Sequence, residues 1–124
     1  MKIIILGANH VAVSLAENLA SEANDITIVD TDADRLRELK DRIDVGTVVG
    51  QPSYPDILRM AGAEDADMLI AVTENDEVNL VACQIAHALF KTPKKICRLR
   101  SASYMANESL FSPGGIAADV VISP

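Results

Sequence analysis

A regular alternation of short β-rich runs with amphipathic segments most constrains the fold of this chain. Six such runs lie at residues 2–6, 26–30, 46–50, 68–72, 95–100 and 119–123. The runs KIIIL (2–6) and MLIAV (68–72) are continuously apolar, which is typical of strands covered on both faces. Strands that alternate with helices in this way predict an α/β fold, a doubly wound, Rossmann-like parallel sheet of six strands with helices on both faces.

The intervening segments carry apolar stripes at helical spacing. These stripes are Val11, Leu15 and Leu19; Leu36, Leu39 and Ile43; and Ile57, Leu58 and Ala61. Thr31 with Asp34, and Ser53 with Asp56, have the spacing of capping boxes with Asp in place of Glu, and Gly62 is expected to end the third helix. We read residues 1–124 as a single domain, and the end of the chain directly after its last strand favours a domain cut from a longer protein.

Composition narrows the class of protein. With 49% hydrophobic residues the chain is expected to be globular, and its net charge of -7 disfavours binding to nucleic acid. The apolar stretches are too short or too interrupted for direct membrane insertion, and no signal peptide is recognisable, so we expect a cytoplasmic protein. Cys83 and Cys97 have no C-x-x-C partner and are interpreted as buried reduced thiols.

The first strand leads into LGANHVA (6–12), a loop like that of dinucleotide-binding folds but with fewer glycines. Free amides and the helix dipole would face an anion there. Gly7 supplies the tight turn and Ala12 the close packing of helix on strand. Asn9 stands at the second glycine position, where a left-handed L-residue costs about 1–2 kcal/mol, less for Asn, and we expect its side chain to project toward the phosphate and weaken binding. His10 could donate to a phosphate or simply be exposed.

Ligands of doubly wound sheets bind at the carboxyl ends of the strands, so residues that follow each strand should converge. Asp30 ends the second strand, 23 positions after Gly7. A carboxylate there can accept from both ribose hydroxyls, which favours NAD or an adenine nucleotide over NADP; the alternative is a helix-capping Asp. Arg98 and Arg100 are expected on one face of the fifth strand, where they could neutralise a phosphate or form a surface or interface ion pair.

No arrangement of Ser, His, Asp or Cys in the sequence indicates catalysis or metal binding. The helix expected at 76–90 is apolar nearly all round. One face can cover the sheet, so the remainder predicts self-association, with His87 partly buried in the core or at an interface.

Longer stretches resemble a known family. These are MKIIILGA, NDITIVDTD, RLRELKD, ILRMAGAEDADMLIAVTENDEVNLVACQIAHALF and the terminal VISP. They are similar to the N-terminal nucleotide-binding domain of the cytosolic regulators of bacterial Trk potassium uptake, within the RCK or KTN class. The resemblance covers essentially the whole chain and is most specific over residues 61–90.

The resemblance implies a regulatory domain, not an enzyme, that binds NAD(H) or ATP/ADP and forms a homo-oligomer under a membrane potassium-translocating subunit, on the inner face of the cell membrane. Carried over by position, the implied binding residues are Gly7, Ala8, Asn9, His10 and Val11 in the phosphate loop, Asp30, Thr31 and Asp32 on the ribose side, Gln51 at the adenine edge, Thr73, Glu74 and Asn75 after the fourth strand, and Arg98 and Arg100 at the phosphate or a partner. The chain departs from the family at Asn9 and Ala12, where Gly is usual, and at Gln51, where many members have Asp.

Three functions remain open. The first is a ligand-gated regulator of potassium transport. The second is a nucleotide-blind assembly scaffold of the same fold, in which Asn9 has abolished binding. The third is a dehydrogenase fragment without its substrate domain. The sequence does not support this function, because it offers no residue that could position a substrate.

Overall fold

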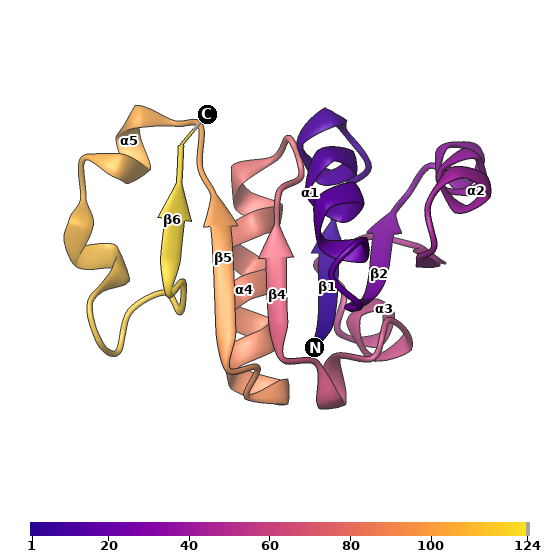
Figure 1. The fold of residues 1–124 in the computed structure, drawn as a ribbon. Helices are drawn as coiled ribbons and strands as arrows, with labels where there is room; N and C mark the ends of the chain where they lie inside the picture. The colour runs from indigo at the N-terminus through magenta and orange to yellow at the C-terminus, as the bar shows by residue number, and fades with distance from the viewer. Residues whose placement is uncertain (124) are drawn as a thin grey trace.

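A computed structural model describes residues 1–123 of the chain. Its elements follow one another as β1 (Lys2–Leu6), α1 (His10–Ala20), β2 (Asp25–Asp30), α2 (Ala33–Arg42), β3 (Gly46–Val49), α3 (Pro55–Met60), the 3₁₀ turn η1 (Ala63–Asp65), β4 (Met68–Ala71), α4 (Asp76–Phe90), β5 (Lys94–Arg98), α5 (Ala102–Met105), the 3₁₀ turn η2 (Glu108–Phe111) and β6 (Val120–Ile122). All six strands pair in parallel in the order β3-β2-β1-β4-β5-β6 (Figure 1). The predicted doubly wound α/β fold is confirmed.

The strand order places a switch point between β1 and β4. From β1 the chain winds outward through β2 to β3, then returns to pair β4 on the other side of β1 and winds outward again. Loops that leave β1 and β4 therefore diverge in opposite directions and open a crevice at the carboxyl edge of the sheet. This edge brings together the segments that follow β1, β2, β3 and β4.

Helices cover both faces of the sheet, with the first two helices on one face and the next two on the other. The helices α1 and α2 pack on one face, where their small and aliphatic residues meet Ile3, Ile5, Ile26 and Ile28. The helices α3 and α4 pack on the other face, and Figure 1 shows α1 and α4 on opposite sides of the sheet. Alternate residues of β1 are buried on opposite faces, as its continuous apolar run predicts.

The predicted capping boxes are wrong in detail. The N-cap of α2 is Asp32, whose carboxylate accepts the amide of Arg35 at 3.0 Å, so Thr31 lies outside the helix. The N-cap of α3 is Tyr54 with no side-chain bond, because Pro55 already fixes the first helical position. Gly62, with φ +94°, ends α3 as expected.

The second half of the sheet differs from the sequence prediction in its boundaries. The strand β5 ends at Arg98 instead of residue 100, and short helices fill the connection to β6. Cys83 and Cys97 are free and buried, as predicted. They are also neighbours, and the Cys97 thiol together with burial raises the pKa of Cys83. His87 is exposed, so its expected partial burial in the core is wrong, and its place at an interface stays a prediction. No helix in residues 1–123 combines the length and apolar character that a membrane span requires.

Candidate functional site

Two hollows lie side by side at the carboxyl edge of the sheet. We call them the loop hollow, of about 340 Å³, and the Gln51 hollow, of about 300 Å³. The loop hollow is lined by Gly7, Ala8, Asn9, Asp30, Asp32, Arg35, Thr73 and Glu74. The Gln51 hollow is lined by Asp30, Thr31, Gln51, Pro52, Thr73, Glu74, Asn75 and Val78. Because Asp30, Thr73 and Glu74 belong to both, the two hollows form one continuous depression across the switch point.

Gly7 makes the turn at the end of β1 possible. Its φ is +112°, and an added Cβ would lie 3.2 Å from the Thr73 Cα and from the Val72 carbonyl. Its amide donates to the Val29 carbonyl at 2.8 Å. Both the left-handed conformation and the close approach to the end of β4 therefore require glycine here.

Asn9 does not adopt the conformation that the sequence predicted. Its φ of -78° and ψ of -177° are extended, because Gly7 already provides the left-handed residue of the turn. Asn9 is the N-cap of α1: its Oδ1 accepts the Ala12 amide at 3.0 Å, and its Nδ2 donates to the Val72 carbonyl at 2.8 Å. The side chain lines the hollow and is held in place by these two bonds. Whether it weakens the binding of a phosphate stays a prediction.

The loop keeps unused backbone donors. Among residues 1–123, the amides of Ala8, Asn9, His10 and Val11 have no acceptor within the protein, whereas the Ala12 amide is taken by Asn9. Free amides at the start of an 11-residue helix form the positive end of its dipole and are suited to bind an anion. His10, which is exposed, and Val11 are not among the residues that line the two hollows. A contact of the His10 side chain with a phosphate stays a prediction.

Asp30 stands at the junction of the two hollows. Its Oδ2 accepts the Asp32 amide at 2.9 Å, which fixes the carboxylate at the end of β2. Because Asp32 caps α2, the alternative in which Asp30 is the helix cap is wrong. Asp30 therefore faces the depression with the acceptor capacity of its other oxygen still available.

Arg35 is a site residue that the sequence analysis missed. It lies in the first turn of α2, is half-buried, and donates from Nε to the Ala8 carbonyl at 2.9 Å. The bond joins the loop after β1 to α2 and brings a guanidinium group to the wall of the loop hollow. A cation in the first turn of a helix opposes the helix dipole, and this was the signal in the sequence.

Asn79 was missed as well. It is fully buried in α4, where its Oδ1 accepts the Thr73 amide at 3.0 Å and the Thr73 hydroxyl at 2.7 Å. Its Nδ2 lies 3.1 Å from the Thr73 carbonyl and 2.9 Å from the Arg98 carbonyl and donates to both. One amide side chain thus fixes the loop after β4 and ties it to the end of β5.

The two arginines predicted to contact the phosphate or a partner do not line the loop hollow. Arg98 lines none of the hollows at this edge, and Arg100, which lies beyond β5, lines a third hollow of about 430 Å³ together with Glu74, Asn75, Asp76, Glu77 and Ser101. The buried Asp76 carboxylate accepts the amides of Arg100 at 3.0 Å and Ser101 at 2.8 Å. These bonds hold the backbone of Arg100 beside the start of α4, so Arg100 lines the third hollow and not the loop hollow, although Glu74 borders both.

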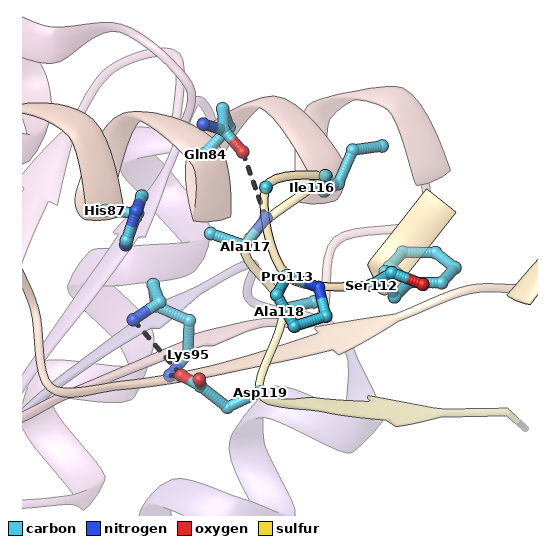
Figure 2. A pocket seen from close by; sticks show the side chains of 12 residues that line it. Gln84, His87, Lys95, Ser112, Pro113, Ile116, Ala117, Ala118 and Asp119 are labelled. Carbon is cyan, nitrogen blue, oxygen red and sulfur yellow. Dashed lines mark hydrogen bonds and ion pairs between the residues drawn. The ribbon is translucent and has the colours of Figure 1, made fainter. Parts of the chain in front are cut away.

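A fourth cavity, of about 450 Å³, lies at the opposite, amino edge of the sheet (Figure 2). Lys95 is buried in its floor, where its ammonium donates to the Thr92 carbonyl at 2.6 Å and to Asp119 at 3.1 Å. Gln84 accepts the Ala117 amide at 3.0 Å, and His87 lies on the same wall. Residues 1–123 contain no group of three His, Cys, Asp or Glu side chains placed to hold a metal ion.

The fold and the loop after β1 define a doubly wound α/β domain with an open, amide-rich helix start at its switch point. The family model described as TrkA-N domain matches residues 3–124, and the chain belongs to that family. It is 62% identical over 124 residues to the Trk system potassium uptake protein TrkA of Halomonas elongata, covering 100% of this chain and 27% of that protein. The corresponding protein of Vibrio alginolyticus is 58% identical over 125 residues, again with 100% and 27% covered. The chain thus spans about a quarter of the length of these relatives.

Solved structures show the same fold. The TrkA-N domain of the inner membrane protein ybaL from Escherichia coli superposes with a TM-score of 0.84 at 22% identity, over 98% of this chain and 86% of that one. The Shewanella denitrificans Kef CTD in AMP-bound form gives 0.78 at 18% identity, over 97% and 71%. The GsuK channel bound to NAD gives 0.79 at 20% identity, over 98% of this chain and 21% of that one.

Proposed function

We propose that the chain is a regulatory nucleotide-binding domain that controls a membrane potassium transporter and binds NAD(H), ATP or ADP at the carboxyl edge of its sheet. The high identity to potassium uptake proteins supports the transport role, and similar folds crystallised with AMP, NAD and ADP support an adenine nucleotide as the ligand. We place the domain in the cytoplasm, on the inner face of the membrane, through its transporter partner.

The observation that carries the proposal is the position of Asp30 between two different hollows. On one side lie unused amides of the loop after β1, suited to phosphates, and on the other lie Gln51 and the apolar Pro52 and Val78, suited to a base. A ribose at Asp30 would donate its hydroxyls to the carboxylate. In this arrangement Ala8 to Val11 bind phosphate, Thr31 and Asp32 border the ribose, Gln51 reads the adenine edge, and Thr73 to Asn75 close the opposite wall.

Regulation requires that the nucleotide bind one arrangement of subunits better than another, by about 1.4 kcal/mol for each tenfold bias. The exposed face of α4 supplies a surface for a second copy, since Val81 is 48% and Leu89 56% exposed. Arg98 and Arg100, away from the loop hollow, are candidates for contacts between subunits. We propose that the domain senses the nucleotide without converting it, which incubation with NADH or ATP followed by chromatography of the products tests directly.

Titration with NADH, ATP and ADP, followed by calorimetry and thermal unfolding, tests the binding proposal. A ligand at a hundred times its Kd should stabilise the fold by about 2.7 kcal/mol. Asp30→Ala should remove this effect, whereas Asp34→Ala, an exposed carboxylate in the first turn of α2 that pairs only with Arg37, should retain it. If none of the three nucleotides binds, the assembly scaffold without a ligand becomes the better account of this chain.

A further inference from the structure

We propose that Arg35 is the residue through which this site reads the phosphates of its ligand, so that the site selects nucleoside diphosphates over the nucleoside itself. The inference rests on the proposed nucleotide binding and adds a binding residue and a ligand class to it. Three observations support it: where Arg35 is anchored, what it leaves unpaired, and what charge surrounds it.

The anchor holds the guanidinium at the phosphate end of the depression. Nε of Arg35 donates to the carbonyl of Ala8, a residue of the loop whose amides remain free. Arg35 lines the loop hollow and not the Gln51 hollow. A nucleotide with its ribose at Asp30 therefore meets Arg35 with its phosphates and not with its base.

The remaining donors of Arg35 are unpaired. Residues 1–123 form five ion pairs, and none of them includes Arg35. Arg37, two positions further along the same helix, is exposed and pairs with Asp34 at 2.9 Å. A guanidinium has five N–H donors in a planar fork, and with Nε bound to Ala8 the two terminal nitrogens can bind a phosphate bidentately.

The charge of the loop hollow makes this cation necessary. Asp30, Asp32 and Glu74 line it, and Arg35 is the one cationic side chain among its lining residues. Without Arg35 a diphosphate would enter a site that holds three carboxylates and no cationic side chain among its lining residues. With it, the positive charge and the amides of the loop act on the same group.

Asp30 and Asp32 argue against an alternative role of Arg35, in which its guanidinium would bind the 2′-phosphate of NADP. Asp30 and Asp32 border the position of the ribose, and Asp30 would repel a phosphate on the 2′ oxygen. We therefore expect the guanidinium to serve the phosphates that lie over Ala8.

The test compares adenosine, ADP, NADH and NADPH as ligands of the wild type and Arg35→Gln by isothermal calorimetry at fixed ionic strength. Arg35→Gln should weaken ADP and NADH by about 10- to 100-fold, the range of a charge-assisted hydrogen bond, and leave adenosine within about twofold. Arg35→Lys should recover only part of the loss, since an ammonium cannot bond Ala8 and a phosphate as a planar fork. Arg37→Gln, which removes the same charge from the same helix, should match the wild type with every ligand.

Each alternative result has a definite reading. If ADP binds the wild type and Arg35→Gln equally, the inference is overturned while nucleotide binding stands. Equal weakening of adenosine and ADP shows that Arg35 only supports the loop, and overturns the inference as well. Tighter binding of NADPH than NADH, lost in Arg35→Gln, assigns the guanidinium to a 2′-phosphate instead. If no ligand binds the wild type, the proposed function falls and this inference with it.

Discussion

The depression at the carboxyl edge of the sheet and the cavity at its amino edge differ in the state of their polar groups. The amino-edge cavity, of about 450 Å³, is larger than either part of the depression, of which the loop hollow is about 340 Å³ and the Gln51 hollow about 300 Å³. In it, the buried Lys95 is satisfied by Asp119 and Thr92, and Gln84 is bonded to the loop across from it (Figure 2). In the loop hollow, the terminal nitrogens of Arg35 and the amides of Ala8 to Val11 have no partner within residues 1–123.

The volume of a cavity does not by itself identify a binding site. Polar groups that satisfy one another stabilise the fold, because a ligand would have to replace bonds that already exist. Polar groups left without a partner in a half-buried position are instead available to a ligand of complementary charge. Substitutions at the carboxyl edge should therefore alter binding, and substitutions at the amino edge should alter stability alone.

The largest effect on stability is expected from Asn79→Leu, which removes the side chain that fixes the wall of the depression. Four contacts to Thr73 and the Arg98 carbonyl are lost, and buried backbone groups remain unsatisfied. We expect the free energy of unfolding to fall by about 3 kcal/mol or more, and nucleotide binding to weaken with it. Urea unfolding followed by circular dichroism measures the first, and calorimetry the second.

Asn79→Asp is the matched comparison, since it keeps the oxygen that accepts from Thr73 but replaces the donor to the two carbonyls with a carboxylate oxygen. Because an uncompensated buried charge facing two carbonyl oxygens is costly, Asn79→Asp should be destabilised at pH 7 at least as much as Asn79→Leu. If Asn79→Leu unfolds like the wild type, the loop after β4 is held by other contacts and the carboxyl edge is less dependent on this network than the structure indicates.

A smaller effect, confined to stability, is expected from Asp119→Asn at the amino edge. Burial would raise the pKa of Asp119, but the amide and ammonium of Lys95, with a smaller contribution from the charge of His87, lower it below 3.8. A carboxylate with a lowered pKa stabilises the fold above the unfolded value and ceases to do so as the pH falls through the folded value. Because the Asp119 side chain is 46% exposed and solvent screens its charge, we expect Asp119→Asn to lose only about 1–1.5 kcal/mol at pH 7 and less at acidic pH, below the ordinary range of an aspartate.

Nucleotide affinity is the control in the same experiment. Asp119→Asn should leave the Kd for ADP or NADH unchanged, because the cavity lies at the other edge of the sheet. A large loss of affinity, or a stability difference that is the same at both pH values, would contradict the division between the two edges.

The fold was predictable because its signal is local and repeated. Short, continuous apolar runs such as residues 2–6 and 68–72 are typical of strands buried on both faces, and parallel strands bring their carboxyl ends to one edge. For the same reason the convergence of Gly7, Asp30, Gln51 and Thr73 was predicted without knowledge of any contact, and the structure confirms it. Their role in binding stays a prediction.

What the sequence could not supply depends on contacts between distant residues. Arg35 becomes part of the site through a bond to Ala8, 27 positions earlier, and Asn79 through a bond to the Arg98 carbonyl. The surroundings of Arg98 and Arg100 were not predictable for a related reason: β5 ends at Arg98, and Asp76 binds the backbone after it, so that Arg100 lines another hollow. Their contact with a phosphate or a partner stays a prediction. Proximity to a strand end predicts the neighbourhood of a residue but not the direction of its side chain.

The smallest effect, and the one that bears most directly on the loop, is expected from Asn9→Gly. The substitution introduces the residue that this family usually carries and removes the bonds to the Ala12 amide and the Val72 carbonyl. Replacing an Asn N-cap by Gly costs only a few tenths of a kcal/mol in a helix, and the lost bond to β4 brings the expected destabilisation to about 1 kcal/mol. Because the Asn9 side chain is held against its own helix, nucleotide affinity should stay within about threefold of the wild type. A tenfold or greater gain in affinity for ADP would mean that the amide group obstructs the phosphate after all, and that the site of this chain has been weakened relative to its glycine-bearing relatives.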